Sequence, residues 1–353
     1  MSDDMLNLYV PYTSYNVLLS MAIAATYPKD DNFMLLVGSA KNLKETADVL
    51  SKIFSENNMR YFALENANIE DSNIRNFFLK KHNLKILGKE IKFLTTVDRI
   101  FYIQEWNVYT TYTVHLAEEL TPSVSFNFLD DGIYTYAEVE KNGKTSLEKL
   151  ADKLAYGGWH VNSNIPGALR GNCSVWALFP ELLPAIYKNK KQERINMEPL
   201  LKQIDEAVLA EETHTCGESN VETIVATDFN SNYASDEYKN IIASIITDCC
   251  GRNLKTVIKR HPADDGSVCF SPAGHYAEEL LACVPIELYY LRFRKSLKKI
   301  VGGLSTALLT ARAMLPEAEI ESVVSRKYME CDENSEEILR LFSQVGVKIT
   351  LIE

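Results

Sequence analysis

The chain has 353 residues, of which 46% are hydrophobic and 24% charged, and its formal net charge is −11 at pH 7. This balance is typical of a soluble globular protein with room for two separate cores, and it excludes a disordered or fibrous chain. The negative charge argues against a dedicated nucleic-acid-binding protein, because such proteins need a basic surface to neutralise phosphates.

The cysteines and the N-terminal residues indicate the compartment. The seven cysteines have no regular spacing and no C-x-x-C pair, which excludes a disulfide framework and a zinc site of that type and favours a reducing compartment. Met1 is followed by Ser2, Asp3 and Asp4, the wrong charge for a signal peptide, and the apolar run 16–27 is too short to span a membrane. We expect a cytoplasmic protein, soluble or peripheral at the inner face of the membrane.

Short β-rich runs alternate with helical patterns through the first third of the chain. Strands are predicted at 6–10, 33–37, 61–64, 99–103 and 124–129, and helices at 14–25, 43–55, 71–82 and 112–119. Strand–helix alternation at this spacing predicts a parallel sheet with helices on both faces.

A second alternation follows a charged stretch, 188–220, that has the composition of an interdomain connector with one helix. Strands are predicted at 222–227, 254–258 and 299–303, helices at 236–249 and from Ser305, and the run 278–284 leads into a helix at Pro285. The predicted division is 1–190, a linker 191–220, and 221–353. This plan resembles the GT-B glycosyltransferase fold, an α/β architecture of two Rossmann-like domains facing each other across a deep cleft.

The first loop with unusual content is Asp130-Asp131-Gly132, directly after a predicted strand. Ligands of parallel α/β sheets bind at the carboxyl ends of the strands. One carboxylate can act there as a general base that points into the cleft while the second orients it, and the glycine allows a sharp turn. The alternative is an ordinary Asp-Gly turn between two strands.

The second loop is Lys259-Arg260-His261-Pro262, again directly after a predicted strand. Its cationic side chains can attract a phosphate, and His261 can hydrogen-bond a phosphate oxygen and donate a proton as the nucleotide leaves. Pro262 holds His261 in an extended conformation. The alternative is a surface loop with solvated charges.

The third loop, Gly302-Gly303-Leu304-Ser305-Thr306, opens a long apolar helix. Free backbone N–H groups and hydroxyls at a helix N-terminus bind anions, whereas the alternative is that Ser305 only caps the helix. No Asp-x-Asp motif of the metal-bridging kind is present, and Asp264-Asp265 is better explained as a solvated turn. The sequence therefore predicts no metal site.

These loops together resemble the bacterial sialyltransferases and polysialyltransferases of the GT-B type, which serve capsule or lipooligosaccharide synthesis. That superfamily has an acidic pair followed by Gly, a His-Pro dipeptide, a Pro-x-Glu and a Ser-Ser/Thr pair, in that order. The same order occurs here as Asp130-Asp131-Gly132, His261-Pro262, Pro285-Ile286-Glu287 and Ser305-Thr306. The resemblance extends from about residue 130 to 310 and includes the opening YVPYTSYNVLLS.

The resemblance implies roles for these residues. Asp130 is expected to be the general base, with Asp131 as the second choice, and His261 to contact the donor phosphate. Among the substrate-binding residues, Lys259 and Pro262 are expected beside the cytidine, Glu287 at the ribose hydroxyls, and Ser305 and Thr306 at the phosphate. Gly132 completes the acidic motif, and Arg260 departs from the small residue expected in some relatives, which leaves its role open.

The implied activity is transfer of sialic acid from CMP-sialic acid to a hydroxyl of a glycan acceptor, with inversion and without a metal ion or another cofactor. The first domain would then bind the acceptor and the second the donor, with the last helix packing back on the first domain. Trp106, Tyr109, Tyr112, Trp159 and His160 are candidates for sugar stacking, and core packing is their alternative.

Two alternatives remain open from sequence: a CMP-Kdo-dependent glycosyltransferase of the same fold, and a non-catalytic nucleotide-binding subunit of a capsule system. A dehydrogenase is poorly supported because no G-x-G-x-x-G follows the first strand. The basic stretch 292–299 fits a solvated helix face, an anionic acceptor or a membrane surface. The oligomeric state is open, a homodimer included.

Overall fold

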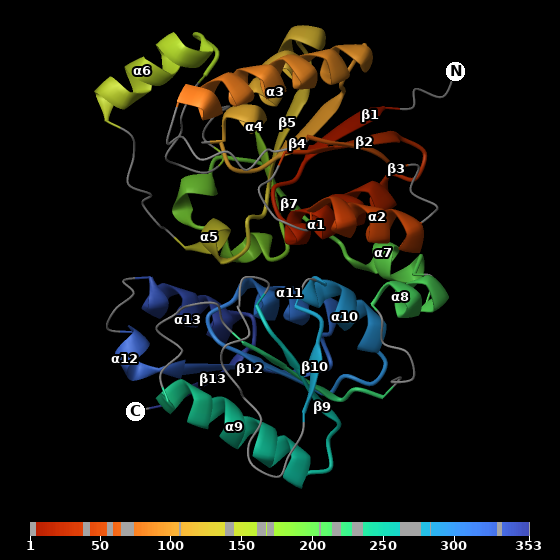
Figure 1. Ribbon diagram of the computed structural model, residues 1–353, viewed down its shortest axis with the longest axis vertical. Coiled ribbons are helices and arrows are strands. Elements are labelled where there is room, and N and C mark those ends of the chain that lie inside the picture. The colour runs from red at the N-terminus through yellow and green to blue at the C-terminus, as the bar shows by residue number, and fades with distance from the viewer. Residues whose placement is uncertain are drawn as a thin grey trace. The chain divides into compact units, whose positions relative to one another are not determined.

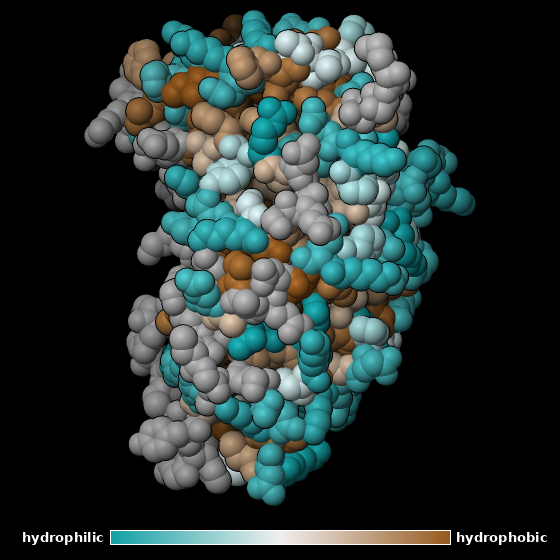
Figure 2. Space-filling view, turned by 90° about the vertical axis from the view of Figure 1, so that its right-hand side faces the viewer, coloured by the Kyte–Doolittle hydropathy of each residue, from teal (hydrophilic) through white to brown (hydrophobic). Residues whose placement is uncertain are grey.

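The protein is described by a computed structural model that covers residues 5–37, 43–54, 59–64, 74–105, 107–137, 145–160, 167, 173–204, 206–213, 220–227, 236–261, 277–282, 284–329 and 334–352. It consists of two compact units, residues 1–204 and 205–353. Hydrophilic side chains cover much of the face drawn in Figure 2, with apolar residues between them. None of the described helices is long and apolar enough to cross a bilayer.

The first unit is a parallel sheet in the order β3-β2-β1-β4-β5-β6-β7 over its described residues. The strands are β1 (Leu6–Val10), β2 (Asp31–Leu36), β3 (Met59–Ala63), β4 (Arg99–Tyr102), β5 (Ser125–Leu129), β6 (Ser174–Ala177) and β7 (Gln192–Arg194). The helices are α1 (Ser14–Thr26), α2 (Leu43–Ile53), α3 (Ile74–Phe93), α4 (Val108–Leu120), α5 (Ile133–Tyr136), α6 (Ser146–Tyr156) and α7 (Glu198–Lys202). Figure 1 shows α3 and α4 on one face of this sheet and α1 and α2 on the other.

The second unit repeats this topology with the strand order β10-β9-β8-β11-β12-β13, also parallel throughout. Its strands are β8 (Thr223–Ala226), β9 (Thr256–Lys259), β10 (Glu278–Leu280), β11 (Lys299–Gly302), β12 (Glu319–Ser325) and β13 (Lys348–Ile352). Its helices are α8 (Glu206–Glu212), α9 (Asp236–Gly251), α10 (Ile286–Phe293), α11 (Thr306–Met314), α12 (Arg326–Met329) and α13 (Ser335–Gln344). The predicted α/β class with two Rossmann-like units is confirmed.

The two faces of the first sheet differ in chemistry because successive side chains of a strand point to opposite sides. Leu6, Leu8 and Val10 of β1 belong to an apolar core that also contains leucines of α3 and Val114 of α4. The alternate residues Asn7 and Tyr9 are fully buried on the other face. Alternate residues of β1 thus pack into the apolar core on one face of the sheet and make buried polar contacts on the other.

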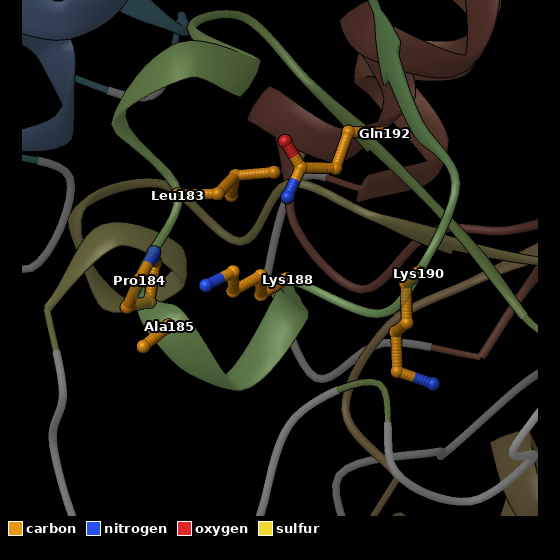
Figure 3. Close-up of a pocket in the computed structure, with 6 residues that line it drawn as sticks. All are labelled: Leu183, Pro184, Ala185, Lys188, Lys190 and Gln192. Atoms are coloured by element: carbon orange, nitrogen blue, oxygen red, sulfur yellow. The ribbon is translucent and has the colours of Figure 1, made fainter.

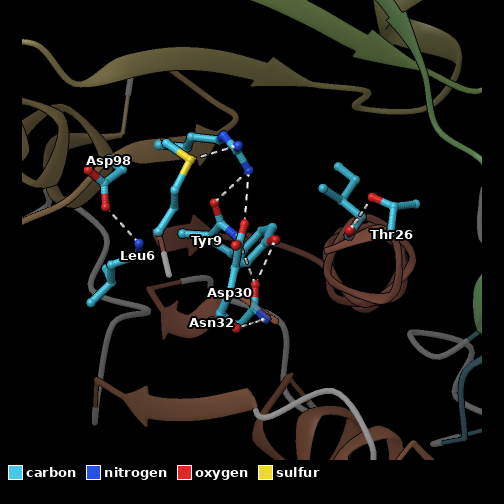
Figure 4. A network of polar contacts seen from close by, with 10 residues as sticks. Leu6, Tyr9, Thr26, Asp30, Asn32 and Asp98 are labelled. Atoms are coloured by element: carbon cyan, nitrogen blue, oxygen red, sulfur yellow. Dashed lines mark hydrogen bonds and ion pairs between the residues drawn. The ribbon is translucent and has the colours of Figure 1, made fainter. Parts of the chain in front are cut away.

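Those polar contacts form a network at the start of the central strands (Figure 4). The Asn7 amide donates to Asn32 at 3.1 Å and to Asp30 at 3.2 Å, and the Tyr9 hydroxyl donates to Asn32 at 3.1 Å. The Arg99 guanidinium pairs with Asp30 at 3.1 Å and lies 4.4 Å from the Tyr27 ring centroid. A slip of one residue would break every one of these contacts, so the network fixes the register of β1, β2 and β4.

The predicted linker 191–220 is corrected in part. Residues 192–194 form β7, the edge strand paired with β6, and α7 packs on α1, so both belong to the first unit. The division falls between residues 204 and 205, inside the predicted stretch. The last described element is also not a helix: β13 pairs with β12, and α13 contacts β13 within the second unit.

The basic stretch 292–299 is not a helix face. Helix α10 ends at Phe293, and the residues that follow turn into β11. Lys298 pairs with Glu222 at 2.5 Å, and the largely buried Lys299 pairs with Glu321 at 2.6 Å. The charges of Lys298 and Lys299 are neutralised within the second unit, because carboxylates of neighbouring segments lie beside them.

Candidate active site

The predicted site residues lie where parallel α/β sheets hold their ligands. Asp130 directly follows β5 in the first unit. In the second unit, Lys259 is the last residue of β9, Glu287 lies in the first turn of α10, and Ser305 follows β11. All are at or beyond the carboxyl ends of strands, as expected for a nucleotide-sugar fold.

Asp130 is completely buried, and hydrogen-bond donors surround its carboxylate. Oδ1 accepts from the backbone N–H of Gly132 at 2.7 Å. Oδ2 accepts from the backbone N–H of Leu178 at 3.1 Å and from the hydroxyl of Tyr136 in a short hydrogen bond. The Tyr136 hydroxyl in turn accepts from the N–H of Phe179 at 3.1 Å. The carboxylate therefore joins the loops that follow β5 and β6.

Burial raises the pKa of Asp130 from 3.8 to about 6, and the hydrogen bonds from Tyr136, Leu178 and Gly132 limit that rise. Burial, followed by the charge of Asp130, raises the pKa of Tyr136 well above its ordinary value. Tyr136 therefore stays protonated and remains a donor near neutral pH. A carboxylate whose pKa lies near the working pH can both take up and release a proton there.

Gly132 makes this arrangement possible. Its φ of 72° lies in the left-handed region, where a Cβ is strained, and its N–H points back at Asp130 from the start of α5. Asn16 of α1 fixes the same loop from the other side, since its amide donates to the Asp130 carbonyl at 3.0 Å.

The two carboxylates of the acidic pair have different surroundings: Asp130 is enclosed by hydrogen-bond donors, whereas Asp131 is half-buried. The Asp131 N–H donates to the Thr135 hydroxyl at 2.6 Å, which anchors the turn into α5. Because Asp130 is completely buried, an acceptor hydroxyl can reach its carboxylate only after a displacement of the groups that enclose it.

The cationic loop after β9 also differs from expectation. The buried Lys259 ammonium donates to the carbonyls of Arg260 at 2.7 Å and Ala282 at 3.1 Å. The Arg260 guanidinium makes two 2.7 Å hydrogen bonds to the Glu279 carboxylate of β10. Both charges serve the second unit itself, which corrects the prediction that three cations attract a phosphate. Of the three side chains only His261 is exposed. Pro262, Asp264 and Asp265 lie outside the described residues.

Glu287 is a buried carboxylate at the N-terminal turn of α10, which begins after Pro285. Burial raises the pKa of Glu287, while its own backbone N–H and the positive charge of Lys259 act in the opposite direction. A carboxylate desolvated in this way is an effective acceptor for hydroxyl donors such as those of a ribose.

Ser305 is the N-cap of α11, and its hydroxyl accepts from the Ala307 N–H at 3.3 Å. The predicted N-cap role of Ser305 is thus confirmed. Thr306 begins the helix beside it, and both side chains are half-buried. A Cβ added at Gly302 would come within 3.3 Å of the buried Leu308, so the glycine allows close packing of β11 against α11.

Sequence reasoning missed two side chains near Asp130. Tyr136 bonds its carboxylate, and Glu105 is a fully buried carboxylate just beyond β4, the strand paired with β5. Burial raises the pKa of Tyr187, and the charges of Glu105, Asp130 and Asp131 act in the same direction. The position of Glu105 after a predicted strand was the available signal.

Of the aromatic residues considered for sugar stacking, some are core residues and others are only partly buried. Tyr109 lies in the apolar core, and Tyr112 and Trp159 pack against that core with their ring centroids 4.8 Å apart. His160 is buried, with Nδ1 3.1 Å from the Thr111 hydroxyl. Trp106 lies outside the described residues. For Tyr109 and His160 core packing is the better explanation.

A pocket of about 540 Å³ lies on the segment between β6 and β7 (Figure 3) and is lined by Leu183, Pro184, Ala185, Lys188, Lys190 and Gln192. It contains none of the predicted site residues. Over the described residues, no three His, Cys, Asp or Glu side chains are grouped as metal ligands would be.

Comparison with known proteins gives a fold. The GT-B domain of a sialyltransferase from Photobacterium damselae, residues 113–497, matches with a TM-score of 0.54 and 12% identity, over 98% of this chain and 99% of that chain. The chain has the GT-B fold. The UDP-GlcNAc 2-epimerase of Neisseria meningitidis bound to UDP-GlcNAc is similar at a TM-score of 0.48 and 12% identity, over 98% and 95% of the two chains. Protein-family models and curated proteins gave no match.

Proposed function

We propose that this GT-B chain is an inverting, metal-independent sialyltransferase that moves sialic acid from CMP-sialic acid to a glycan hydroxyl in capsule or lipooligosaccharide synthesis. The observation that carries the proposal is the buried Asp130 carboxylate, whose pKa is raised to about 6 at the carboxyl end of β5. A purely structural turn has no need of a proton acceptor tuned to neutral pH.

In the proposed reaction Asp130 takes the proton of the acceptor hydroxyl as that oxygen bonds to the anomeric carbon of sialic acid. The bond from this carbon to the phosphate oxygen breaks, and its electron pair leaves with CMP. In the proposal the acceptor hydroxyl would replace the Tyr136 hydroxyl as a donor to Asp130, which requires a rotation of the Tyr136 side chain on the short helix α5.

The donor would bind to the second unit. Glu287 would accept hydrogen bonds from the ribose hydroxyls, and the N-terminus of α11 with Ser305 and Thr306 would hold the phosphate. His261, the exposed side chain of the loop after β9, would contact the departing phosphate and stabilise its charge. Lys259 would act through Glu287, whose pKa its charge lowers, rather than by contact with the phosphate.

The proposed setting is the cytoplasm, with peripheral association at the inner face of the membrane where a lipid-linked acceptor would be reached. The partners are CMP-sialic acid and the glycan acceptor. The donor already carries a good leaving group, so the proposal assigns no step to a metal ion or a cofactor.

The test is CMP release by the purified protein from CMP-sialic acid, in EDTA, with galactosides, sialosides and oligosialic acid as acceptors. We expect release that requires an acceptor and that Asp130→Asn reduces by at least about a hundredfold, the usual contribution of a general base. Asp131→Asn is the matched control, with the same change of charge on the neighbouring residue, and should retain most of the activity.

Each other outcome has a definite meaning. Turnover of CMP-Kdo but not of CMP-sialic acid would keep the fold and overturn the donor. Binding of CMP without turnover of either donor would favour the non-catalytic subunit. A large loss in Asp131→Asn with little loss in Asp130→Asn would move the base to Asp131.

A further inference from the structure

Helix α3 is strongly basic in an acidic chain. It contains six Lys or Arg residues and a single acidic residue, Glu90, whereas the whole chain has a net charge of −11. Its exposed positions recur every three or four residues, so they share one side of the helix. They are Phe78, Lys81, His82, Lys85, Lys89, Lys92 and Phe93. This side is therefore basic, with an exposed aromatic ring near each end.

The lysines of this side are not neutralised by neighbouring carboxylates. Within the described ranges, Lys85, Lys89 and Lys92 form no ion pair, and Lys81 lies 4.8 Å from the Phe77 ring centroid. Some lysines elsewhere do have such partners, since Lys202, Lys298 and Lys299 all contact carboxylates. Phe78 and Phe93 are 63% and 82% exposed, values unusual for such large apolar side chains.

Helix α6 has its apolar stripe turned outward. Leu147, Leu150 and Leu154 fall on one side of the helix and are 79%, 55% and 80% exposed. The polar residues of the helix are divided: Glu148 and Lys153 are exposed, whereas the Asp152 carboxylate lies 3.8 Å from Nε2 of the buried His160. An amphipathic helix with this orientation leaves apolar surface in water that another phase or partner would cover.

The two helices are neighbours. The rings of Phe77 on α3 and Tyr156 on α6 lie with their centroids 6.0 Å apart. Both helices lie on the same side of the first sheet (Figure 1). The exposed leucines of α6 and the exposed lysines and phenylalanines of α3 thus form one region of the first unit, which we call the α3–α6 surface.

We propose that the α3–α6 surface docks this protein on a bilayer that contains anionic phospholipids. Interfacial helices combine Lys side chains with Phe and Leu in this way: the ammonium groups contact lipid phosphates while the rings and leucines enter the acyl boundary. Anionic lipids attract each nearby lysine, and the exposed Lys81, Lys85, Lys89 and Lys92 supply that attraction in a protein whose net negative charge is otherwise repelled. A row of exposed lysines beside exposed leucines is what a membrane surface needs, whereas a protein partner would not require this combination.

This inference does not depend on the proposed reaction. It also replaces the stretch 292–299, which the sequence alone had offered as a membrane contact, since Lys298 and Lys299 are paired within the second unit.

The experiment is co-sedimentation of the full-length protein with vesicles of phosphatidylcholine alone or mixed with phosphatidylglycerol. We expect binding to the mixed vesicles that weakens as salt is added, and little binding to phosphatidylcholine. Lys85→Glu with Lys89→Glu should lower the affinity by about thirtyfold or more, because two attractive charges become repulsive. Leu150→Ser with Leu154→Ser should lower it by about tenfold.

Matched controls carry the same changes elsewhere on the first unit: Lys29→Glu with Lys44→Glu for charge, and Ile186→Ser for an exposed apolar residue. Thermal unfolding shows whether each variant is folded, and exposed positions should leave it unchanged. Binding that is equal for the two vesicle types, wild-type binding by both α3–α6 variants, or no binding to either vesicle would overturn the proposal. The last result would leave a protein as the occupant of this surface.

Discussion

Asp130 illustrates how one residue's surroundings set its chemistry. Its pKa is about 6 in the folded protein and 3.8 without those surroundings. A carboxyl group with a raised folded pKa binds its proton more tightly in the folded state. The stability it contributes is therefore greatest below its unfolded pKa and is lost as the pH rises through the folded pKa.

This linkage predicts a pH-dependent difference between wild type and Asp130→Asn. Between about pH 4 and about pH 7, the free energy of unfolding of wild type should fall by about 2 kcal/mol relative to that of the variant. Urea denaturation at both pH values measures the difference, and Asp131→Asn should follow the wild type. Identical pH dependence of wild type and Asp130→Asn would contradict the buried, protonatable carboxyl.

Tyr136 is the residue that tunes this carboxyl group. Tyr136→Phe removes the side-chain donor to Oδ2, so the pKa of Asp130 should rise above about 6. The acidic limb of the pH profile of kcat/KM for CMP release should then move to higher pH by up to about one unit. An unchanged profile would show that Tyr136 supports the loop without tuning Asp130.

At the scale of the element, a row of ion pairs, called here the ion-pair ladder, connects the last three strands of the second sheet, β11, β12 and β13. Glu321 on β12 lies 2.6 Å from Lys299 on β11 and 3.3 Å from Lys348 on β13, and it accepts from the Thr350 hydroxyl at 2.6 Å. Burial acts to raise the pKa of Glu321, but these partners together hold it below its ordinary value. The ladder explains why charged residues stand in strands of a largely buried sheet.

Removing one residue of the Lys299–Glu321 ion pair should lower the free energy of unfolding more than replacing both residues. Glu321→Ala leaves Lys299 largely buried without its main partner and should lower the free energy of unfolding by about 3 kcal/mol. The double variant Lys299→Met, Glu321→Leu should recover much of this loss, because no buried charge remains unpaired. Guanidinium denaturation of the three proteins tests the prediction. A double variant as unstable as Glu321→Ala would refute it.

At the scale of the whole molecule, each unit has a sheet and an apolar core of its own. If the donor site lies in the second unit, CMP should stabilise that unit by mass action, by about 3 kcal/mol at a hundred times its Kd. Differential scanning calorimetry should then show two transitions, of which CMP raises one. The raised transition should be lost in Glu287→Ala. An equal upward shift of both transitions would contradict a donor site confined to one unit.

Several features were predictable because they depend on neighbours in sequence. The alternation of strands and helices, the N-cap Ser305 and the start of α10 after Pro285 follow from local pattern and capping chemistry. The candidate loops were located for the same reason, since a strand end can be recognised within a few residues. The short strands β6 and β7 were not predicted, because a hydrophobic pattern of so few residues cannot be distinguished from a loop.

The sequence by itself determined the α/β class, the two-unit plan and which residues follow the strands, because periodicity and turn chemistry are local. Only the tertiary structure decided which of those residues are enclosed: it buried Asp130 under Tyr136 and Leu178, paired Arg260 with Glu279, and exposed Lys85, Lys89 and Lys92 of α3 without an ion pair among the described residues. Burial and partnership depend on segments distant in sequence, and these two quantities set whether a charged side chain binds a ligand, holds the fold or faces a membrane.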